Sequence, residues 1–325
     1  LAWNATITAF ELLDARPGDV FLGALPLFHS FGQSVVMNAA FRAGACVALM
    51  ERFSGDAALH VMEKERVTVY EGVPTMTIAL IEAYKKQPRA IALKTAMSGG
   101  ASLPLAVLEE FECLFGVPLY EGYGLSETSP VASFNQECFG RKPGTVGCGI
   151  WGVDLAVARA DLDDRIELLA DGELGEIVIR GHNIFKGYLN RPEATAAALV
   201  DGWFRTGDLG TKDAEGFITI VDRKKDLIIR GGFNVYPREL EEVLIRHPDV
   251  AQVAVIGVPH ATHGEEVVAV IVARSGARLD AGAFVDWSQQ RLGKHKYPRR
   301  IELIDALPLG PSGKVLKREL RARFA

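Results

Sequence analysis

Three glycine-rich turns in the first half of this chain constrain its fold more than any other feature. Each follows a short apolar run and leads into helical periodicity, and the runs are "VTVYEGVPTM" (67–76), "TAMSGGASLPLAVLEEF" (95–111) and "VPLYEGYGLSET" (117–128). Strands that alternate with helices predict a parallel sheet, which binds ligands at the carboxyl ends of its strands. The turns fall at those ends, so we expect a ligand site there. In the second run, Ser102 is predicted to cap the helix.

The pattern changes after residue 144, because strand-like alternation with Asp-Gly and Glu-Gly turns replaces the helices. We predict a small β barrel over 145–222, and an α/β subdomain with a parallel sheet over 1–144. These two parts would form what remains of a large N-terminal domain. The charged segment 221–232 marks the predicted boundary to a small, mobile α+β domain at 223–325. The predicted fold class is therefore α/β with a C-terminal lid domain.

Charge is divided unevenly along the 325 residues. Residues 223–325 carry a net charge of +6, whereas the whole chain carries −5 and residues 1–222 therefore carry −11. A basic small domain suits an anionic ligand, although charge complementarity with the acidic part explains it equally well. The acidic larger part and the lack of an aromatic–basic platform argue against nucleic acid as a partner.

Hydropathy and cysteine usage indicate whether the chain crosses a membrane and in which kind of compartment it folds. The most apolar window, "SVVMNAAFRAGACVALM" (34–50), contains Arg42 in its middle, so we expect a buried core segment and no transmembrane segment. Four scattered cysteines without CxxC spacing argue against a zinc ribbon or a disulfide scaffold. They are typical of a reducing compartment, so a cytoplasmic location is expected.

Six short motifs occur in an order that carries more weight than any one of them. They are "PLFHSFG" (26–32), "SGGASLP" (98–104), "YEGYGLSET" (120–128), "WFRTGDLG" (203–210), "DRKKDLIIRGGFNVYPRELE" (222–241) and "PSGKVLK" (311–317). Together they closely resemble the adenylate-forming superfamily of acyl-CoA synthetases, luciferases and peptide-synthetase adenylation domains. The resemblance covers nearly all of the chain. It implies that ATP activates a carboxylic acid to an acyl-adenylate, which then passes to a thiol, usually that of coenzyme A.

The resemblance implies a set of nucleotide contacts that suit the residues present. Tyr123 offers a flat face for adenine, and Asp208 would accept hydrogen bonds from both ribose hydroxyls. Paired glycines leave the backbone bare, so adenine can lie against it, although a tight turn explains them equally well. Arg223 is matched to a second ribose contact, with a surface salt bridge as the alternative. The matched nucleotide-binding positions are Gly99, Gly100, Ala101, Tyr123, Gly124, Asp208 and Arg223.

The resemblance also implies four catalytic positions. Glu127 would help to hold Mg²⁺, a hard ion that prefers carboxylate and phosphate oxygens. The hydroxyl of Ser126 would bond the α-phosphate, and Thr128 would assist. Lys314, presented by a turn at 311–313, would bridge the substrate carboxylate and the α-phosphate as negative charge gathers there.

A rotation of the small domain is implied as well. Lys225 matches the hinge at which relatives switch between an adenylating and a thioester-forming arrangement. Gly231 and Gly232 would line the pantetheine tunnel for coenzyme A in the second arrangement. A basic patch could attract the phosphates of coenzyme A or be a plain solvated face, and it consists of Lys294, Lys296, Arg299 and Arg300.

The acid substrate is predicted from the pocket positions. Phe28 and His29 match the acyl-pocket side of the site, where we expect His29 to gate the pocket rather than transfer protons. Segment 26–36 has no acidic residue to hold a substrate ammonium, so amino acids are disfavoured. Acetate-activating relatives carry tryptophan at Gly124, so glycine would open a deep apolar pocket that favours longer acids. We expect a medium- or long-chain fatty acid and leave an aromatic acid open.

One family element is not found, namely the Ser/Thr/Gly-rich phosphate loop, and "GPSGKVLK" (310–317) does not fit the spacing GxxxxGK[ST]. We therefore expect a C-terminal portion of an enzyme, with that loop upstream of Leu1, that adenylates poorly by itself.

The main hypothesis is an ATP-dependent fatty acid–CoA ligase, with a homodimer left open. One alternative is an enzyme that loads an acyl or aryl acid onto a carrier protein. The other is a non-catalytic nucleotide-binding fragment, against which the intact set of Glu127, Asp208, Arg223 and Lys314 argues.

Overall fold

The computed structural model describes residues 1–310 and 313–325, so Pro311 and Ser312 of the predicted turn lie outside the described residues. The chain divides into two compact units, Leu1–Ile220 and Val221–Ala325. The boundary expected from the sequence lies two residues further on, between 222 and 223. The first unit contains two sheets and the second contains one, and each unit has its own apolar core clusters.

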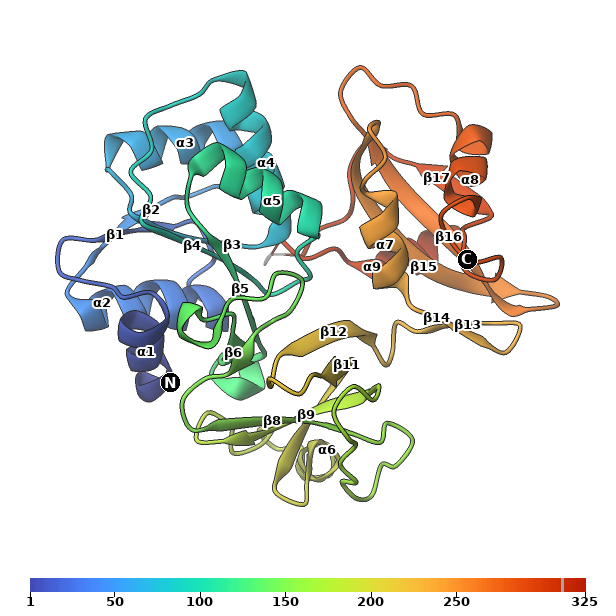
Figure 1. Cartoon of the computed structure of the whole chain (residues 1–325), viewed down its shortest axis with the longest axis horizontal. Coiled ribbons are helices and arrows are strands. Elements are labelled where there is room, and N and C mark those ends of the chain that lie inside the picture. Colours follow the sequence, from blue (N-terminus) through green and yellow to red (C-terminus); the bar gives the residue numbers. More distant parts are fainter. Residues whose placement is uncertain (311–312) are drawn as a thin grey trace. The chain divides into compact units, whose positions relative to one another are not determined.

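A seven-stranded sheet forms the centre of the first unit (Figure 1). Its order is β2-β1-β3-β4-β5-β6-β7, in which β1 to β5 are parallel while β6 and β7 pair antiparallel. The α/β fold is thereby confirmed, with an antiparallel edge added to the parallel strands. The strands are β1 (Val20–Gly23), β2 (Cys46–Leu49), β3 (Val69–Gly72), β4 (Thr95–Gly99), β5 (Leu119–Gly124), β6 (Val131–Phe134) and β7 (Cys148–Gly149).

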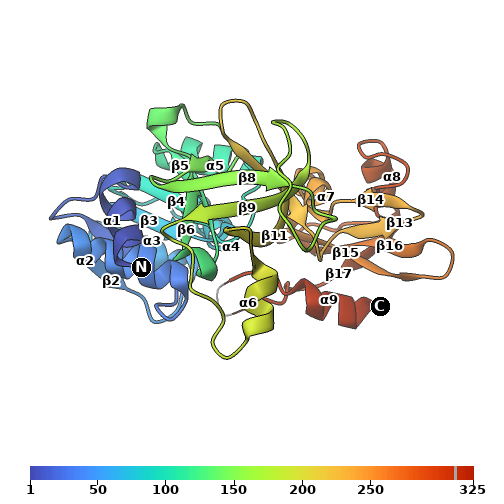
Figure 2. The same cartoon turned by 90° about the horizontal axis from the view of Figure 1, so that it is seen from below.

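Helices cover both faces of this sheet (Figures 1 and 2). Helices α3, α4 and α5 share one core cluster, and the elements between α1 and α2 share the other. Strands buried on both faces account for the continuous apolar runs in the sequence. The helices are α1 (Ala2–Ile7), α2 (Ala39–Ala43), α3 (Gly55–Lys64), α4 (Pro74–Lys86) and α5 (Leu105–Phe115), with the π-helical segments η1 (Thr8–Leu12) and η2 (Phe31–Asn38).

The cap predicted for α5 is wrong. The helix begins at Leu105, and the residue that precedes it is Pro104, whose extended backbone has φ −61° and ψ 134°. Proline has no side-chain acceptor, so the helix lacks the hydrogen-bonded cap that Ser102 was expected to provide.

The predicted barrel is a curled antiparallel sheet in the order β10-β11-β9-β8, with β12 beside β11. Asp201 and Gly202 join β10 to β11 and have φ of 50° and 80°, as a two-residue hairpin turn requires. Two short helical turns interrupt the last strands of the first sheet, η3 (Ser126–Thr128) between β5 and β6 and η4 (Glu137–Phe139) between β6 and β7. The elements are β8 (Val153–Ala158), β9 (Gly175–Gly181), α6 (Pro192–Ala198), β10 (Leu199–Val200), β11 (Trp203–Lys212) and β12 (Ile218–Arg223).

The second unit is an α+β domain around a five-stranded sheet. The order is β14-β13-β16-β15, with β17 parallel to β16. Alternate residues of β15 face opposite sides of the sheet, so one side packs against α7 and α8 and the other against α9. The elements are β13 (Ile228–Arg230), β14 (Phe233–Val235), α7 (Pro237–Leu244), β15 (Val250–His260), β16 (Gly264–Ala273), α8 (Ala281–Gln289), β17 (Arg300–Leu303) and α9 (Lys317–Phe324).

Among the described residues, no helix is both long and apolar enough to cross a membrane.

Glu71 in β3 places a carboxyl group in the apolar interior. Its side chain is fully buried, and neither carboxyl oxygen has a hydrogen-bond partner among the described residues. Burial raises the pKa of Glu71 well above its ordinary value. The folded protein therefore keeps this proton at pH values where the unfolded chain has lost it.

This difference predicts that the stability of the first unit falls as pH rises. The free energy of unfolding should decrease by up to about 1.4 kcal/mol per pH unit between the unfolded pKa of Glu71 and its raised folded pKa, because only the native state retains the proton. Glu71→Gln should remove this slope. Urea unfolding from pH 5 to pH 8 measures it, with the exposed Glu51→Gln as control. An equal slope in Glu71→Gln and in the parent chain would contradict the assignment.

Candidate functional site

The carboxyl end of β5 carries the first group of predicted site residues. Tyr123 and Gly124 end the strand, and the turn η3 follows one residue later. The buried hydroxyl of Thr128 accepts a hydrogen bond from the Leu125 amide at 2.8 Å and also contacts the carbonyl oxygens of Leu125 and Pro130. Thr128 thus holds the shape of the turn, which favours a positioning role for this predicted catalytic residue.

Gly124, the last residue of β5, packs against the backbone of Pro130, which directly precedes β6. A Cβ atom at this position would lie 1.9 Å from the carbonyl oxygen of Pro130, so no side chain fits without a shift of the backbone. Close backbone packing is therefore sufficient reason for a glycine here. The pocket-opening role of Gly124 stays a prediction.

The turn after β4 is equally tight. Gly99 is buried, and a Cβ atom there would lie 3.2 Å from the ring of Phe31. Gly100 adopts φ +78°, a backbone conformation that favours glycine. Ala101 is exposed. The predicted adenine-facing segment thus lies at the carboxyl end of β4, next in the sheet to the turn that follows β5.

A hydrogen bond between the two sheets brings the predicted adenine and ribose residues together. The Tyr123 hydroxyl donates to Oδ2 of Asp208 at 2.6 Å, and Asp208 is only 3% exposed. Strand β11 bulges at this point, because its pairing with β9 is irregular between Arg205 and Leu209 and Gly207 has φ +72°. A bulge redirects side chains, and here it lets the Asp208 carboxylate reach the end of β5.

A buried carboxylate supports that bulge. Glu176 of β9 forms an ion pair with Arg205 and accepts a hydrogen bond from the Gly207 amide at 3.0 Å. The Asp208 amide donates to the hydroxyl of Thr206, also at 3.0 Å. These side-chain contacts occupy the irregular part of β11. The sequence motifs alone did not reveal the role of Glu176, which lies outside all six.

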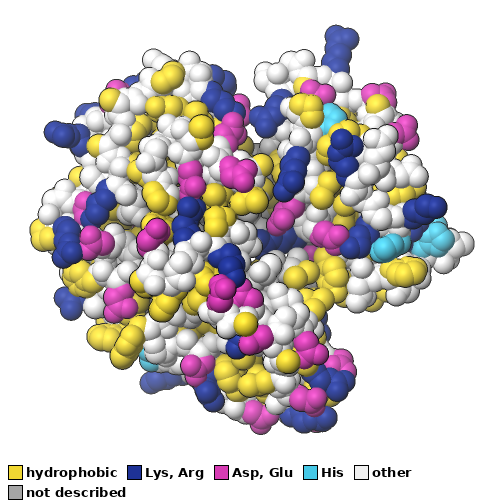
Figure 3. Space-filling model, in the orientation of Figure 1, with side chains coloured by type: hydrophobic (Ala, Val, Ile, Leu, Met, Phe, Trp, Pro, Cys, Tyr) yellow, Lys and Arg dark blue, Asp and Glu magenta, His cyan; other side chains and the backbone are white. Residues whose placement is uncertain are grey.

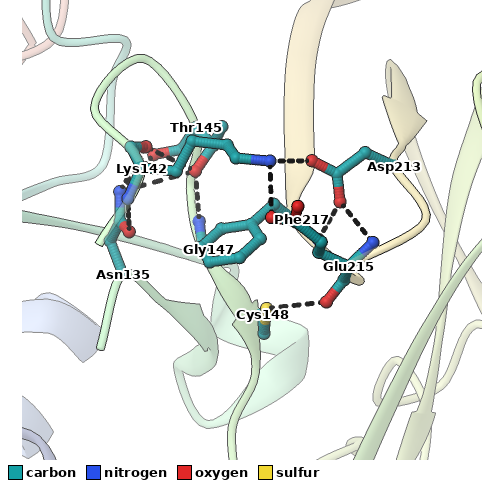
Figure 4. A network of polar contacts seen from close by, with 8 residues as sticks. All are labelled: Asn135, Lys142, Thr145, Gly147, Cys148, Asp213, Glu215 and Phe217. Atoms are coloured by element: carbon teal, nitrogen blue, oxygen red, sulfur yellow. Dashed lines mark hydrogen bonds and ion pairs between the residues drawn. The ribbon is translucent and has the colours of Figure 1, made fainter. Parts of the chain in front are cut away.

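A second polar network ties the end of β11 to the loop after β6 (Figure 4). Lys142 contacts Asp213, lies 3.0 Å from Glu215, and sits 4.8 Å from the ring centroid of Phe217. Lys142 lowers the pKa of Asp213. The Val146 amide donates to the backbone of β12 at 2.8 Å. The network therefore holds β11, and with it Asp208, against the larger sheet.

The turn η3 also meets the predicted pocket segment. Oγ of Ser126 lies 3.0 Å from Oγ of Ser30, which directly follows His29. Phe28 is 78% exposed, and Nδ1 of His29 accepts a hydrogen bond from the Phe31 amide at 3.2 Å. The structure thus places the predicted phosphate hydroxyl beside the predicted acid-pocket loop.

Glu127 is held by a residue that sequence reasoning missed. The Tyr188 hydroxyl donates to Oε1 of Glu127 at 2.9 Å, and the Phe185 amide donates to the Glu127 carbonyl oxygen at 2.8 Å. Burial raises the pKa of Tyr188 to about 12, and the neighbouring Glu127 acts in the same direction. The tyrosine lies 61 residues from its partner, so only the fold reveals the pair.

The remaining predicted site residues belong to the second unit. Arg223 ends β12, and the exposed Lys225 lies in the turn before β13. Gly231 and Gly232 form the β13–β14 turn with φ of 58° and 83°. The carbonyl oxygen of Lys314 accepts a hydrogen bond from the Gly310 amide at 2.8 Å.

The predicted basic patch is largely neutralised within its own unit. Lys296 lies 2.7 Å from Glu239, and Arg300 lies 2.6 Å from Glu302. Basic and acidic side chains are intermixed on the visible surface (Figure 3). These pairs favour the solvated-face interpretation over a dedicated phosphate site.

Two protein-family models match this chain. The model of the AMP-binding enzyme family matches residues 1–189, and the model of the AMP-binding enzyme C-terminal domain matches residues 239–314. The chain belongs to the AMP-binding enzyme family, and the resemblance to adenylate-forming enzymes is confirmed.

Its curated relatives are longer than this chain. It is 40% identical to a long-chain-fatty-acid–CoA ligase of Bacillus subtilis over 98% of this chain and 56% of the relative. It is 39% identical to a feruloyl-CoA synthase of Amycolatopsis sp. over 100% of this chain and 65% of the relative. The chain therefore spans somewhat more than half of the length of these relatives.

Solved structures show the same fold. ATP-bound MatB from Rhodopseudomonas palustris is 35% identical, with a TM-score of 0.89 over 100% of this chain and 63% of that chain. The o-succinylbenzoate CoA synthetase of Bacillus subtilis, in complex with its acyl-adenylate intermediate, is 34% identical, with a TM-score of 0.84 over 98% of this chain and 64% of that chain.

The hydrogen bond from Tyr123 to Asp208 predicts that Tyr123→Phe and Tyr120→Phe will lower the free energy of unfolding by different amounts. Tyr123→Phe should lower the free energy of unfolding by about 1.5–3 kcal/mol, because it removes a hydrogen bond to a buried carboxylate. Tyr120→Phe is the matched control, since its hydroxyl bonds Glu137 at an exposed position, and it should lose less than about 1 kcal/mol. Urea unfolding measures both. Equal losses would show that the hydrogen bond to Asp208 contributes no more to the free energy of unfolding than the exposed bond of Tyr120.

Proposed function

We propose that this chain is the adenosine- and acid-binding part, with the C-terminal domain, of an ATP-dependent acid–CoA ligase. The contact between Tyr123 and Asp208 carries this proposal, because it unites the adenine and ribose positions beside the exposed Ser126. The ATP-bound and acyl-adenylate-bound structures of the relatives support the same reading. A non-catalytic fragment would not need this whole arrangement.

The residues at this end of the sheet suit the chemistry of adenylation. Asp208 would accept the ribose hydroxyls, and the ring of Tyr123 would support adenine. Ser126 would donate to the α-phosphate, with the loop of His29 next to it. We retain Arg223 as the second ribose contact and Lys225 as the hinge of the second unit.

Magnesium fits this proposal through Glu127. Among the described residues, no group of three or more acidic, histidine or cysteine side chains is arranged to hold a metal ion. Tyr188 holds Oε1 of Glu127, and the described residues give its other carboxylate oxygen no hydrogen-bond partner. One carboxylate plus substrate phosphates is a usual Mg²⁺ environment, in which the ion offsets phosphate charge.

The acid that we propose is a medium- or long-chain fatty acid, with coenzyme A as the acceptor. The lack of an acidic residue in segment 26–36 and the 40% identical fatty-acid–CoA ligase support it. An aromatic acid is the second candidate, because a feruloyl-CoA synthase is 39% identical.

A panel of acids tests the proposal. We expect a form of the chain extended to the length of its relatives to release pyrophosphate and form hydroxamates with fatty acids from octanoate to palmitate. Acetate and amino acids should give at least tenfold less. Ferulate and indoleacetate measure the aromatic alternative. Turnover of amino acids alone would contradict the pocket argument, and no pyrophosphate with any acid would contradict the proposed reaction.

The proposed role of Lys314 predicts that its substitution slows the first half-reaction, acyl-adenylate formation, and spares the second. In the extended form, Lys314→Ala should slow acyl-adenylate formation by about 10²–10³, because a cation would no longer face the charge that develops at the α-phosphate. Attack of coenzyme A on supplied acyl-adenylate should be nearly unchanged. Arg318→Ala, which alters an exposed residue, is the control. Equal losses in both half-reactions would contradict the assigned role.

A further inference from the structure

The helix that follows Lys314 is anchored by two ion pairs inside the second unit. Nζ of Lys317, the first residue of α9, lies 2.7 Å from Oε1 of Glu241 in α7. One turn later, Nη2 of Arg321 lies 2.8 Å from Oδ1 of Asp226. The helix is also held by apolar contacts to β15 through Leu320 and Phe324.

The first ion pair lies in a partly enclosed environment. The side chains of Lys317 and Glu241 are 19% and 23% exposed, so solvent and salt screen the pair less than they screen a surface pair. Oε1 of Glu241 also accepts a hydrogen bond from the Val255 amide at 2.8 Å. Burial raises the pKa of Glu241 and Lys317 opposes this effect. Without the lysine, this carboxyl would be left partly buried without a cation.

The second ion pair reaches the segment next to the proposed hinge. Asp226 directly follows Lys225, and its amide donates to the Arg223 carbonyl oxygen at 2.9 Å. Arg321 therefore connects α9 to the first turn after β12. Asp226 lies on the C-terminal side of residue 225, so the ion pair places α9 and this residue on the same side of the proposed hinge.

Backbone hydrogen bonds join the described residues that precede Lys314 to those that follow it. The Leu316 amide donates to the Pro308 carbonyl oxygen at 2.9 Å, and the Gly310 amide donates to that of Lys314 at 2.8 Å. Leu309 and Val315 form a β-bridge between these two bonds. Lys317 follows Leu316 directly, so its ion pair sets the place of the base of the loop.

We infer that Lys317 and Arg321 are positioning residues for the adenylation step. Their partners in α7 and beside the hinge join α9, the described residues next to Lys314 and the hinge segment to one another. The inference rests on the proposed function, since it assigns to Lys314 the cation used in adenylation. Rotation at the hinge then places or withdraws this cation without loss of position within the domain.

Hydrogen exchange tests the rigid connection without any activity. In residues 1–325, Lys317→Met should speed exchange of the Gly310 and Leu316 amides at least fivefold, and Lys317→Arg should restore the slow rate. Arg318→Met is the matched control, because Arg318 is exposed and next in the sequence. Equal exchange in Lys317→Met and Arg318→Met would overturn the inference.

Half-reaction kinetics in the extended form then separate positioning from general stability. Lys317→Met and Arg321→Met should each lower kcat for acyl-adenylate formation at least tenfold, with KM for ATP and attack of coenzyme A on supplied acyl-adenylate changed less than twofold. Equal losses in both half-reactions would show a merely structural role. If the parent enzyme releases no pyrophosphate with any acid, the proposed function fails, and the exchange comparison still decides whether Lys317 holds the loop.

Discussion

The hydrogen bond from Tyr123 to Asp208 is the contact on which the candidate site depends. It joins the end of a parallel strand to a bulge in an antiparallel one, at 2.6 Å and largely away from solvent. The bulge needs the carboxylate of Glu176, and the antiparallel sheet is held in place by Lys142 and its acidic partners. These contacts bring together the residues that we propose as the adenosine site, with Ser126 and Glu127 next to them in the chain. The proposed activity rests on this arrangement.

Local signals in the sequence predicted the elements that carry the site. Apolar runs that end in glycine-rich turns placed β3, β4 and β5, and their order in the sheet puts the turns at one edge. Alternation and Asp-Gly turns predicted the antiparallel sheet, and the Asp201-Gly202 turn adopts the expected conformation. These features depend on residues that are neighbours in the chain, so periodicity reveals them. The joint order of the six motifs then identified the family.

What the sequence did not reveal depends on contacts between distant segments. Tyr188 lies 61 residues from Glu127, and no spacing rule pairs a tyrosine with a carboxylate at that distance. The packing reason for Gly124 comes from Pro130, which directly precedes β6, a strand whose antiparallel direction was not predicted. Ser102 had the side chain of a cap, but Pro104 set the start of the helix through its backbone. In each case tertiary geometry outweighed a local preference.

A crystal structure of the chain with bound AMP would show whether Tyr123 and Asp208 hold the adenosine. We expect both ribose hydroxyls to lie within hydrogen-bond distance of the Asp208 carboxylate while adenine lies against the ring of Tyr123. The phosphate should point toward Ser126 and Glu127. AMP bound at another place, or bound with its ribose away from Asp208, would contradict the account.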